Sequence, residues 1–308
     1  MKAVRYHAHG DSDVLAYEDA ERPVAGPGQV VVKVAGTSFN PVDVAIRAGY
    51  LQQVFPLSFP HIPGVDVAGT VTEIGEGVTG QRTGEPVVAF LPMNAPGAAA
   101  EYVAVPAGVL AAAPRAVDLA DAAALPAAGL TAWQALVEHA GLQPGQSVLV
   151  NGAGGAVGGY AVQLAARTGA AVTATASPRS VERVRSYGAQ TIIDYTLTPV
   201  TETGERFDVV LNLVTTSAEE TEALVGLAAD GGVFVSTTTP GRDDAARGVR
   251  AVRMFARSDA AQLAELVNRM DAGALAIDVA ARRPLADLAA VHDEAVTGRL
   301  PGKTVLIP

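Results

Sequence analysis

The spacing of apolar residues changes twice along the chain, near Leu119 and again near Phe255. Before Leu119, apolar residues form short β-branched runs that are separated by Gly and Pro turns. Such runs are typical of strands, and the clearest of them predict strands at 29–34, 65–74 and 101–105. Because the runs are short and turns separate them, we expect an antiparallel, barrel-like unit.

Between these two positions, strand-like runs alternate with segments of helical spacing. Apolar residues recur at helical intervals from Leu130 to Ala140, and Gly141 followed by Pro144-Gly145 ends that predicted helix. The remaining elements predicted here are strands at 148–151, 171–176, 191–193, 208–214 and 232–237 and helices that include 156–168 and 180–187. This alternation predicts a doubly wound α/β domain with a parallel sheet and right-handed crossovers.

The last segment adds four more elements, which are candidates for returning to the first domain. They are a helix at 263–270, a strand at 276–280, a helix at 285–297 and a strand at 304–307. The predicted organisation is therefore a β-rich domain made of residues 1–118 and 256–308, and an α/β domain made of residues 119–255.

Composition and charge exclude several classes of function. The net charge of -10 and the lack of any Lys/Arg run argue against binding nucleic acid. The chain has no cysteine, which excludes disulfides, cysteine nucleophiles and thiolate metal sites and fits a reducing cytoplasm. No apolar run reaches the roughly 18 residues of a membrane span, and the N-terminus lacks the apolar core of a signal peptide. We expect a soluble, cytoplasmic protein.

A glycine-rich turn at 148–158 reads VLVNGAGGAVG and joins a predicted strand to a predicted helix. Glycines in such a turn let pyrophosphate approach the main chain, and the helix N-terminus offers N–H groups and a positive dipole end. One frame starts at Gly152-x-Gly154 but has Val157 at its last glycine position. The other, at 153–158, reads A-x-G-x-x-G and keeps the last two glycines. The turn predicts a dinucleotide site; the alternative is a purely structural turn.

The end of the second strand of this domain indicates which dinucleotide binds. An acidic side chain there would hold the ribose 2′-OH of NAD, but the sequence has Ser177 and Arg179, with no acid before Glu182. A hydroxyl and a guanidinium suit a 2′-phosphate, which favours NADPH over NADH. The alternative is that Ser177 caps the next helix and Arg179 is solvated.

Several motifs, in order along nearly the whole chain, resemble the zinc-independent quinone oxidoreductase branch of the medium-chain dehydrogenase/reductase superfamily. The segments that carry the resemblance are FNPVD at 39–43, RAGY at 47–50, PGVDVAG at 63–69, ALPAAGLTAW at 124–133, the glycine turn, YGA at 187–189, IDY at 193–195 and GKTV at 302–305. The resemblance implies a GroES-like catalytic domain made from both chain ends, a Rossmann domain, an active site in the cleft between them, and a homodimer.

The resemblance also implies where NADPH binds. The residues it implies are Gly155, Ala156, Val157 and Gly158 at the pyrophosphate, Ser177, Arg179 and Tyr195 around the adenosine phosphate, and Thr131, Val214, Thr237 and Thr238 on the nicotinamide side. Tyr195 and Thr237 could equally be ordinary residues at strand ends.

Zinc alcohol dehydrogenases of this superfamily bind their metal through a Cys and a His-Glu pair. The matching region around Thr37-Ser38 has no Cys, and Gly64-Val65-Asp66 stands where the His-Glu pair would be. The histidines lie far apart in the sequence, at His7, His9, His61, His139 and His292. We therefore expect no metal. Without a Lewis acid, reducing an activated acceptor is easier than oxidising a simple alcohol.

The candidate catalytic residues are Asn40 and Tyr50, which the resemblance places in the substrate pocket. Asn40 could hydrogen-bond the substrate or a cofactor hydroxyl, or be a turn residue before Pro41. Tyr50 could donate to a carbonyl, or end a loop. Some relatives carry a Tyr where this chain has Ala45, so solvent could supply the proton.

Three other charged residues in the family-like segments have weaker predictions. Lys303 either touches the cofactor or is a solvated Lys before a strand, and Asp43 and Asp66 are expected to brace loops. The sequence thus predicts an NADPH-dependent oxidoreductase that passes hydride to a quinone. An enone or enoyl reductase and a non-catalytic NADPH-binding sensor are the alternatives.

Overall fold

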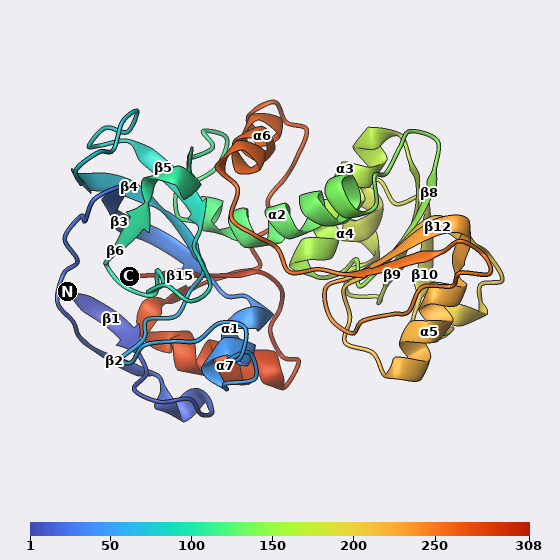
Figure 1. Cartoon of the computed structure of the whole chain (residues 1–308), viewed down its shortest axis with the longest axis horizontal. Helices are drawn as coiled ribbons and strands as arrows, with labels where there is room; N and C mark the ends of the chain where they lie inside the picture. The colour runs from blue at the N-terminus through green and yellow to red at the C-terminus, as the bar shows by residue number, and fades with distance from the viewer. The chain divides into compact units, whose positions relative to one another are not determined.

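The computed structural model describes all residues, 1–308, and divides into two compact units (Figure 1). The first comprises Met1–Ala127 and Arg257–Pro308, and the second comprises Ala128–Ala256. We describe each unit by itself. Both chain ends therefore belong to the first unit.

The first unit is built on a mainly antiparallel, seven-stranded sheet. Its strand order is β14-β15-β3-β4-β5-β7, and β6 pairs with β3 outside this path. The strands are β3 (Gln29–Ser38), β4 (Asp66–Ile74), β5 (Pro86–Phe90), β6 (Tyr102–Pro106), β7 (Leu110–Ala112), β14 (Ala281–Pro284) and β15 (Thr304–Ile307), and a separate hairpin joins β1 (Lys2–Arg5) to β2 (Ala16–Asp19). The strands predicted in the first third of the chain are confirmed.

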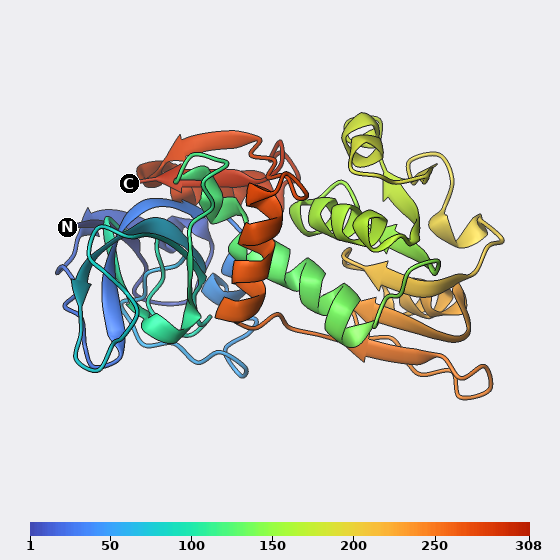
Figure 2. The same cartoon turned by 90° about the horizontal axis from the view of Figure 1, so that it is seen from above.

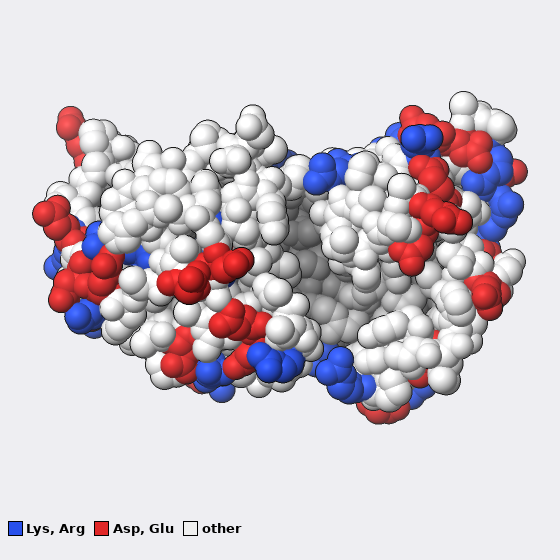
Figure 3. All heavy atoms as spheres, turned by 90° about the horizontal axis from the view of Figure 1, so that it is seen from below, with Lys and Arg blue, Asp and Glu red and all other residues white.

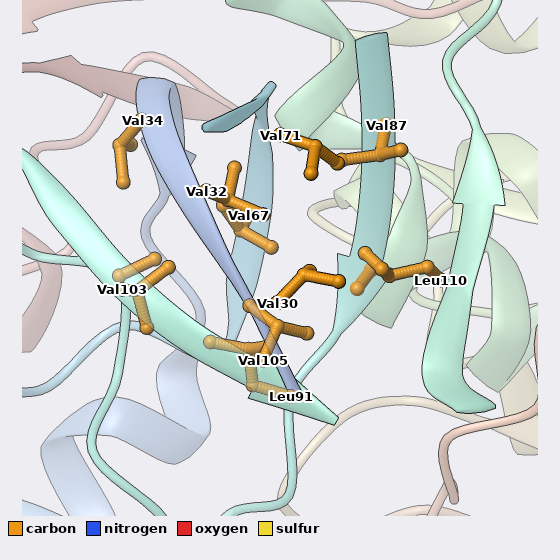
Figure 4. Close-up of a cluster of buried hydrophobic side chains, with 12 residues drawn as sticks. Val30, Val32, Val34, Val67, Val71, Val87, Leu91, Val103, Val105 and Leu110 are labelled. Atoms are coloured by element: carbon orange, nitrogen blue, oxygen red, sulfur yellow. The ribbon is translucent and has the colours of Figure 1, made fainter. Parts of the chain in front are cut away.

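Alternate residues of these strands form the core of the sheet. Val30, Val32 and Val34 of β3 point into it with Val67 and Val71 of β4, as Figure 4 shows. A residue every second position faces the same side of a strand, so the alternation in the sequence produces this continuous buried face.

Short helices complete the first unit. They are α1 (Pro41–Arg47), α6 (Ala260–Asp271), α7 (Leu288–Val296) and 3-10 turns at Ser12–Val14, Ala107–Val109, Asp121–Ala124 and Leu285–Asp287. A second apolar cluster joins α7 to β1 and β15 through Val291, Val4 and Leu306.

The second unit has a six-stranded, fully parallel sheet in the order β10-β9-β8-β11-β12-β13. Numbered along the chain from β8, this is the 3-2-1-4-5-6 order of a Rossmann fold, whose direction of winding reverses between its first and fourth strands. The strands are β8 (Ser147–Asn151), β9 (Ala171–Ala176), β10 (Thr191–Asp194), β11 (Phe207–Asn212), β12 (Ala228–Ser236) and β13 (Arg250–Arg253). The Rossmann prediction is confirmed.

The helices of this unit connect the parallel strands. They are α3 (Ala156–Thr168), α4 (Val181–Ser186) and α5 (Ala218–Gly226), with a 3-10 turn at Val200–Glu202. The helix α2 (Pro126–Trp133) continues into a π-helical segment, Gln134–His139, as the continuous green helix of Figure 2 shows. The helical spacing from Leu130 predicted this helix but not its change of pitch.

Two details of the predicted organisation differ from the structure. The strand predicted at 276–280 is wrong, because pairing with β15 begins only at Ala281 opposite Thr304. Residues 276–280 therefore form no strand ladder, and the edge strand β14 contains an exposed Arg282 and a half-buried Arg283. In addition, residues 119–127 pack within the first unit, where the turn Asp121–Ala124 contacts β3 and β4.

Acidic and basic side chains are interspersed on the face shown in Figure 3, and no continuous basic patch lies there. No helix in the chain combines the length and the apolar character needed to cross a membrane.

Candidate functional site

The glycine-rich turn connects β8 to α3 in the second unit. Asn151 ends β8, and Gly152 turns the chain in the left-handed region with φ +95°. Gly155 is the N-cap of α3 and provides no side-chain hydrogen bond. The first helical N–H groups, at Ala156 and Val157, therefore have neither an intrahelical acceptor nor a side-chain cap.

Two glycines of this turn have different steric roles. A Cβ on Gly158 would lie 2.5 Å from Ala153 Cα, so glycine is required for the helix to pack against the turn. A Cβ on Gly155 would meet only Gly152 O, at an ordinary 3.5 Å. Nothing in the protein itself requires glycine at 155, and that open space next to free N–H groups fits a pyrophosphate. The two glycines of the frame A-x-G-x-x-G therefore lie at one open position, Gly155, and one position that requires glycine, Gly158.

Polar side chains meet where the winding of the parallel sheet reverses. Asn151 donates from Nδ2 to Asn212 Oδ1 at 2.9 Å and accepts from Thr175 Oγ1 at 3.0 Å. Thr175 in turn accepts from Gly152 N at 2.8 Å. These three side chains hold the ends of β8, β9 and β11 together. Sequence reasoning missed them, although a polar residue closing an apolar run was the available signal.

The end of β9 carries the residues that were predicted to select the cofactor. Ser177 is buried and lies in a tight turn in which Ser180 and Val181 donate backbone N–H groups to its carbonyl. Arg179 is exposed. Arg183, one turn into α4, donates from Nη2 to Gly154 O at 2.8 Å and so braces the glycine turn. No acidic side chain stands at this strand end.

The residues predicted on the nicotinamide side fall into two groups. Val214, Thr237 and Thr238 lie together, because Thr238 Oγ1 donates to Val214 O and Thr237 N donates to Asn212 O. Thr131 belongs to another element, the helix α2. Tyr195 follows β10 with 55% of its surface exposed. The residues of the first group lie just after β11 and β12.

Asn40 lies at the centre of a buried polar cluster in the first unit. It is the N-cap of α1, and its backbone N donates to Asp43 Oδ2 at 2.9 Å. Its side-chain Nδ2 donates to Asp66 Oδ2 at 2.8 Å and to Ser38 O at 3.2 Å. Its Oδ1 accepts from Lys303 Nζ at 2.8 Å.

These bonds fix the orientation of the Asn40 amide. The ammonium of Lys303 can only donate, so the side-chain oxygen of Asn40 must face Lys303. The carboxylate of Asp66 accepts, so the side-chain nitrogen of Asn40 must face Asp66. Both amide hydrogens are used within the protein. Asn40 therefore has no donor left for a substrate carbonyl and can offer only a lone pair of Oδ1 to a hydroxyl.

Lys303 is not solvated, and that alternative is wrong. Its side chain is 5% exposed and reaches Asn40, Phe39 O at 3.1 Å and Asp66 at 3.4 Å. Burial lowers the pKa of Lys303, and the carboxylates of Asp66 and Asp43 oppose this shift. Asp66 also accepts from Ser38 Oγ and from the N–H of Ala127, so Asp66 braces the cluster as expected.

Tyr50, the second candidate catalytic residue, is separate from this cluster. It follows α1 and is 83% exposed. Its backbone N donates to Ala45 O, which places it in the turn that leaves the helix. The structure thus joins Asn40 with Lys303 and leaves Tyr50 free on the surface.

The positions that match the zinc site of related dehydrogenases have no metal-binding set. Thr37 Oγ1 donates to Asp66 O at 2.7 Å, and Ser38 Oγ donates to the Asp66 carboxylate at 2.5 Å. No group of three or more His, Cys, Asp or Glu residues in the chain could hold a metal ion. Two histidines, His61 and His292, are buried packing residues.

The buried titratable groups make the stability of the fold depend on pH. Burial lowers the pKa of His61 to about 4 and that of His292 to about 3, and it raises the pKa of Asp43 to about 7. Between pH 4 and 6.5 the unfolded chain binds more protons at each histidine, so both make stability rise with pH. Asp43 binds its proton in the folded state and makes stability fall from about pH 4 to 7.

The two histidines outweigh the one aspartate. We expect the free energy of unfolding to rise by about 3 kcal/mol between pH 4 and 6.5, at about 1.4 kcal/mol for each net pKa unit. Urea unfolding at several pH values measures this. A stability that is constant or falls over this range would contradict the burial of the two histidines.

A Rossmann sheet with an open glycine turn, together with an antiparallel unit made of both chain ends, defines a nicotinamide-dependent oxidoreductase with a small-molecule substrate. Family models agree with both units: the alcohol dehydrogenase GroES-like domain matches residues 26–115, and the zinc-binding dehydrogenase model matches residues 187–306.

Individual relatives identify the branch of this class. The chain is 40% identical to the chloroplast envelope quinone oxidoreductase homolog of Arabidopsis thaliana over 69% of its own length and 68% of the relative's. It is also 40% identical to the chloroplastic NADPH-dependent alkenal/one oxidoreductase of Arabidopsis thaliana, over 70% of this chain and 57% of that one. The quinone oxidoreductase structure from Coxiella burnetii aligns with a TM-score of 0.88 at 27% identity, covering 100% of this chain and 99% of that one. The chain belongs to the quinone oxidoreductase-like branch of the medium-chain dehydrogenase/reductase superfamily.

Proposed function

We propose that this enzyme is a zinc-independent, NADPH-dependent quinone oxidoreductase. The observation that carries the proposal is a buried cluster around Asp66. Ser38 and Asp66, from the two segments that match the zinc ligands of related dehydrogenases, are bonded to each other there, and Asp66 also contacts Asn40 and Lys303. One carboxylate with an ammonium, an amide and two hydroxyls does not supply the three or four Cys, His or carboxylate ligands of a zinc site. Without a Lewis acid, the favoured substrate is an acceptor that is already electrophilic.

The bound nicotinamide would supply hydride. A quinone or other conjugated carbonyl would delocalise the negative charge that develops when it accepts the hydride. Residues of the chain would bind and orient the cofactor and the acceptor and would exclude water from them. We propose Gly155, Ala156, Val157 and Gly158 for the pyrophosphate; Ser177, Arg179 and Tyr195 for the adenosine phosphate; and Thr131, Val214, Thr237 and Thr238 for the nicotinamide side. Lys303 acts indirectly, by fixing the amide of Asn40.

Asn40 and Tyr50 remain the proposed substrate residues, with different roles. Asn40 can accept from a hydroxyl of the cofactor or of the reduced product, because both of its N–H groups are used. The phenol of Tyr50 is free to donate to a carbonyl oxygen. Solvent would complete the reduction with a proton.

The main alternative is an enone reductase, which the name of the alkenal/one relative favours. The test is NADPH oxidation by the purified enzyme with a panel of quinones, enones and enoyl thioesters at matched concentrations. Quinones should give the highest kcat/KM. A preference for enones or thioesters would replace the proposed acceptor. Saturable cofactor binding with no turnover on any acceptor would support a non-catalytic sensor.

Arg179 provides the test of the cofactor. Arg179→Ala should weaken NADPH binding about tenfold, since a charge-assisted bond to phosphate contributes roughly 1.5–3 kcal/mol. NADH binding should not change, because NADH lacks the 2′-phosphate. Fluorescence titration with both cofactors measures the two dissociation constants.

Arg185→Ala is the matched control, since Arg185 is an exposed arginine of the neighbouring helix that pairs with Glu182 at 2.7 Å. It should leave both affinities unchanged. Equal affinities for NADPH and NADH in the unmodified enzyme would refute the phosphate site.

We also propose a homodimer, supported by the free outer edge of β13 in the parallel sheet. Light scattering after size exclusion would show twice the chain mass. A cytoplasmic location stays a prediction; the two relatives from Arabidopsis thaliana have chloroplast names.

A further inference from the structure

Three buried polar atoms in the first unit have no hydrogen-bond partner in the protein. They are Tyr6 Oη, Arg47 Nε and His292 Nε2. Tyr6 and His292 are fully buried, and Arg47 is 3% exposed. An unsatisfied buried donor costs about 1–3 kcal/mol, so three of them in one small region require an explanation.

The tautomer of His292 is determined by its neighbour. Arg47 Nη1 lies 3.2 Å from His292 Nδ1, and a guanidinium can only donate. Nδ1 is therefore the acceptor, and the ring hydrogen is on Nε2. Burial and the nearby Arg47 both lower the pKa of His292, which keeps the ring neutral. His292 thus directs a buried N–H donor that has no acceptor.

Two small, partly enclosed cavities are lined by Tyr6 and by His292, respectively, and Asp43 lines both. The first, of about 10 Å³, is lined by Tyr6, Asp43 and His61. The second, also of about 10 Å³, is lined by Asp43, His292 and the hydroxyl residues Thr37 and Ser38. A cavity of about this volume holds one water molecule if polar groups line it.

We propose that each cavity holds one structural water, and that the two waters link Tyr6 and His292 to the carboxylate of Asp43. The first water accepts from Tyr6 Oη–H and donates to Asp43. The second accepts from His292 Nε2–H and donates to the same carboxylate. A water is both acceptor and donor, so it satisfies an orphan N–H or O–H and a carboxylate at the same time.

Asp43 is suited to this central position. Its Oδ2 accepts from Asn40 N, and Gly64 N also bonds its carboxylate, which leaves lone pairs for the two waters. The charged groups that act on it are Asp66 and Lys303.

The two proposed waters would connect elements that are far apart in the sequence to the helix that carries Asp43. Tyr6 follows β1, Asp43 lies in the first turn of α1, and His292 lies in α7. Asp43 also forms the capping box with Asn40. The waters would therefore tie two other elements, the segment after β1 and α7, to α1, which Asn40 caps. This inference does not depend on which substrate or cofactor the enzyme uses.

Tyr6→Phe distinguishes hydrated from empty cavities by the sign of its effect. If water bridges Tyr6 and Asp43, removing the hydroxyl leaves that water short of a partner, and the melting temperature falls. If the cavity is dry, the substitution removes an unsatisfied hydroxyl, and the melting temperature stays the same or rises. Tyr17→Phe, at a tyrosine that is 44% exposed, is the matched control and should not change it.

A high-resolution crystal structure of the unmodified chain provides the direct test. We expect one ordered water in each cavity, within hydrogen-bond distance of the Asp43 carboxylate and of Tyr6 Oη or His292 Nε2. Two empty cavities would overturn the inference, as would a melting temperature that stays the same or rises in Tyr6→Phe. A water in the first cavity alone would overturn the link to His292.

Discussion

Lys303→Met is expected to lower the free energy of unfolding by about 3–5 kcal/mol, the usual result of removing one partner from a buried ion pair. Methionine has a similar length but no charge and no donors. Asp66, which is fully buried, would keep three neutral hydrogen bonds and lose its only counter-charge. Asn40 Oδ1 and Phe39 O would lose their donor. Urea unfolding followed by circular dichroism measures the loss.

Two further variants show whether burial of charge is the cause. The double variant Lys303→Met/Asp66→Asn removes both charges and should recover part of the stability, which a double-mutant cycle would quantify. Arg206→Met breaks the exposed pair with Asp230, at 3.4 Å, and should cost at most about 1 kcal/mol. If the two single variants lose the same small amount, the cluster around Lys303 does not stabilise the fold as described.

Gly158→Ala is expected to cost about 1–3 kcal/mol of stability, as overpacking in a tight site does, and to abolish detectable NADPH binding. The new methyl group would lie 2.5 Å from Ala153 Cα and closer still to Gly152 O. Both neighbours are backbone atoms of the glycine turn, so relief requires α3 to move away from β8. That movement would displace the N–H groups proposed for the pyrophosphate. Thermal unfolding and fluorescence titration measure the two effects.

Gly226→Ala is the matched control for this substitution. Gly226 is an exposed helical glycine at the end of α5, and a Cβ there would meet nothing within 4 Å. Because alanine is the better helix former, stability should stay the same or rise by up to about 1 kcal/mol. Unchanged stability and cofactor binding in Gly158→Ala would show that α3 does not need this close approach.

Much of the fold could be predicted because its causes are local in the sequence. Buried parallel strands appear as short apolar runs, and α3 lies at the predicted residues Ala156–Thr168. Strand β14 was misplaced because an edge strand is defined by its pairing with β15 and carries little apolar signal. The π-helical pitch of Gln134–His139 likewise leaves the spacing of apolar residues almost unchanged.

The candidate site also has some features that the sequence predicts and others that only the structure shows. The glycine turn is contiguous in the sequence, so the nucleotide fold could be inferred directly, and the missing acid at the end of β9 is the local signal on which the proposal of NADPH rests. The partners of Lys303 could not, because Asn40 and Asp66 lie 263 and 237 residues away along the chain. The predicted choice between a solvated and a cofactor-binding Lys303 omitted a third possibility, a buried ion pair.

By itself, the sequence determined the class of this protein: two kinds of sheet, a dinucleotide turn, and positions without zinc ligands. Those features depend on periodicity and on residues that are neighbours in the chain. Only the tertiary structure decided what the polar residues can do. It showed that both amide hydrogens of Asn40 are used, and that Tyr6 and His292 direct unsatisfied donors beside cavities that Asp43 lines. Hydrogen-bond capacity and solvation depend on which side chains folding brings together, and no local pattern in the sequence records that.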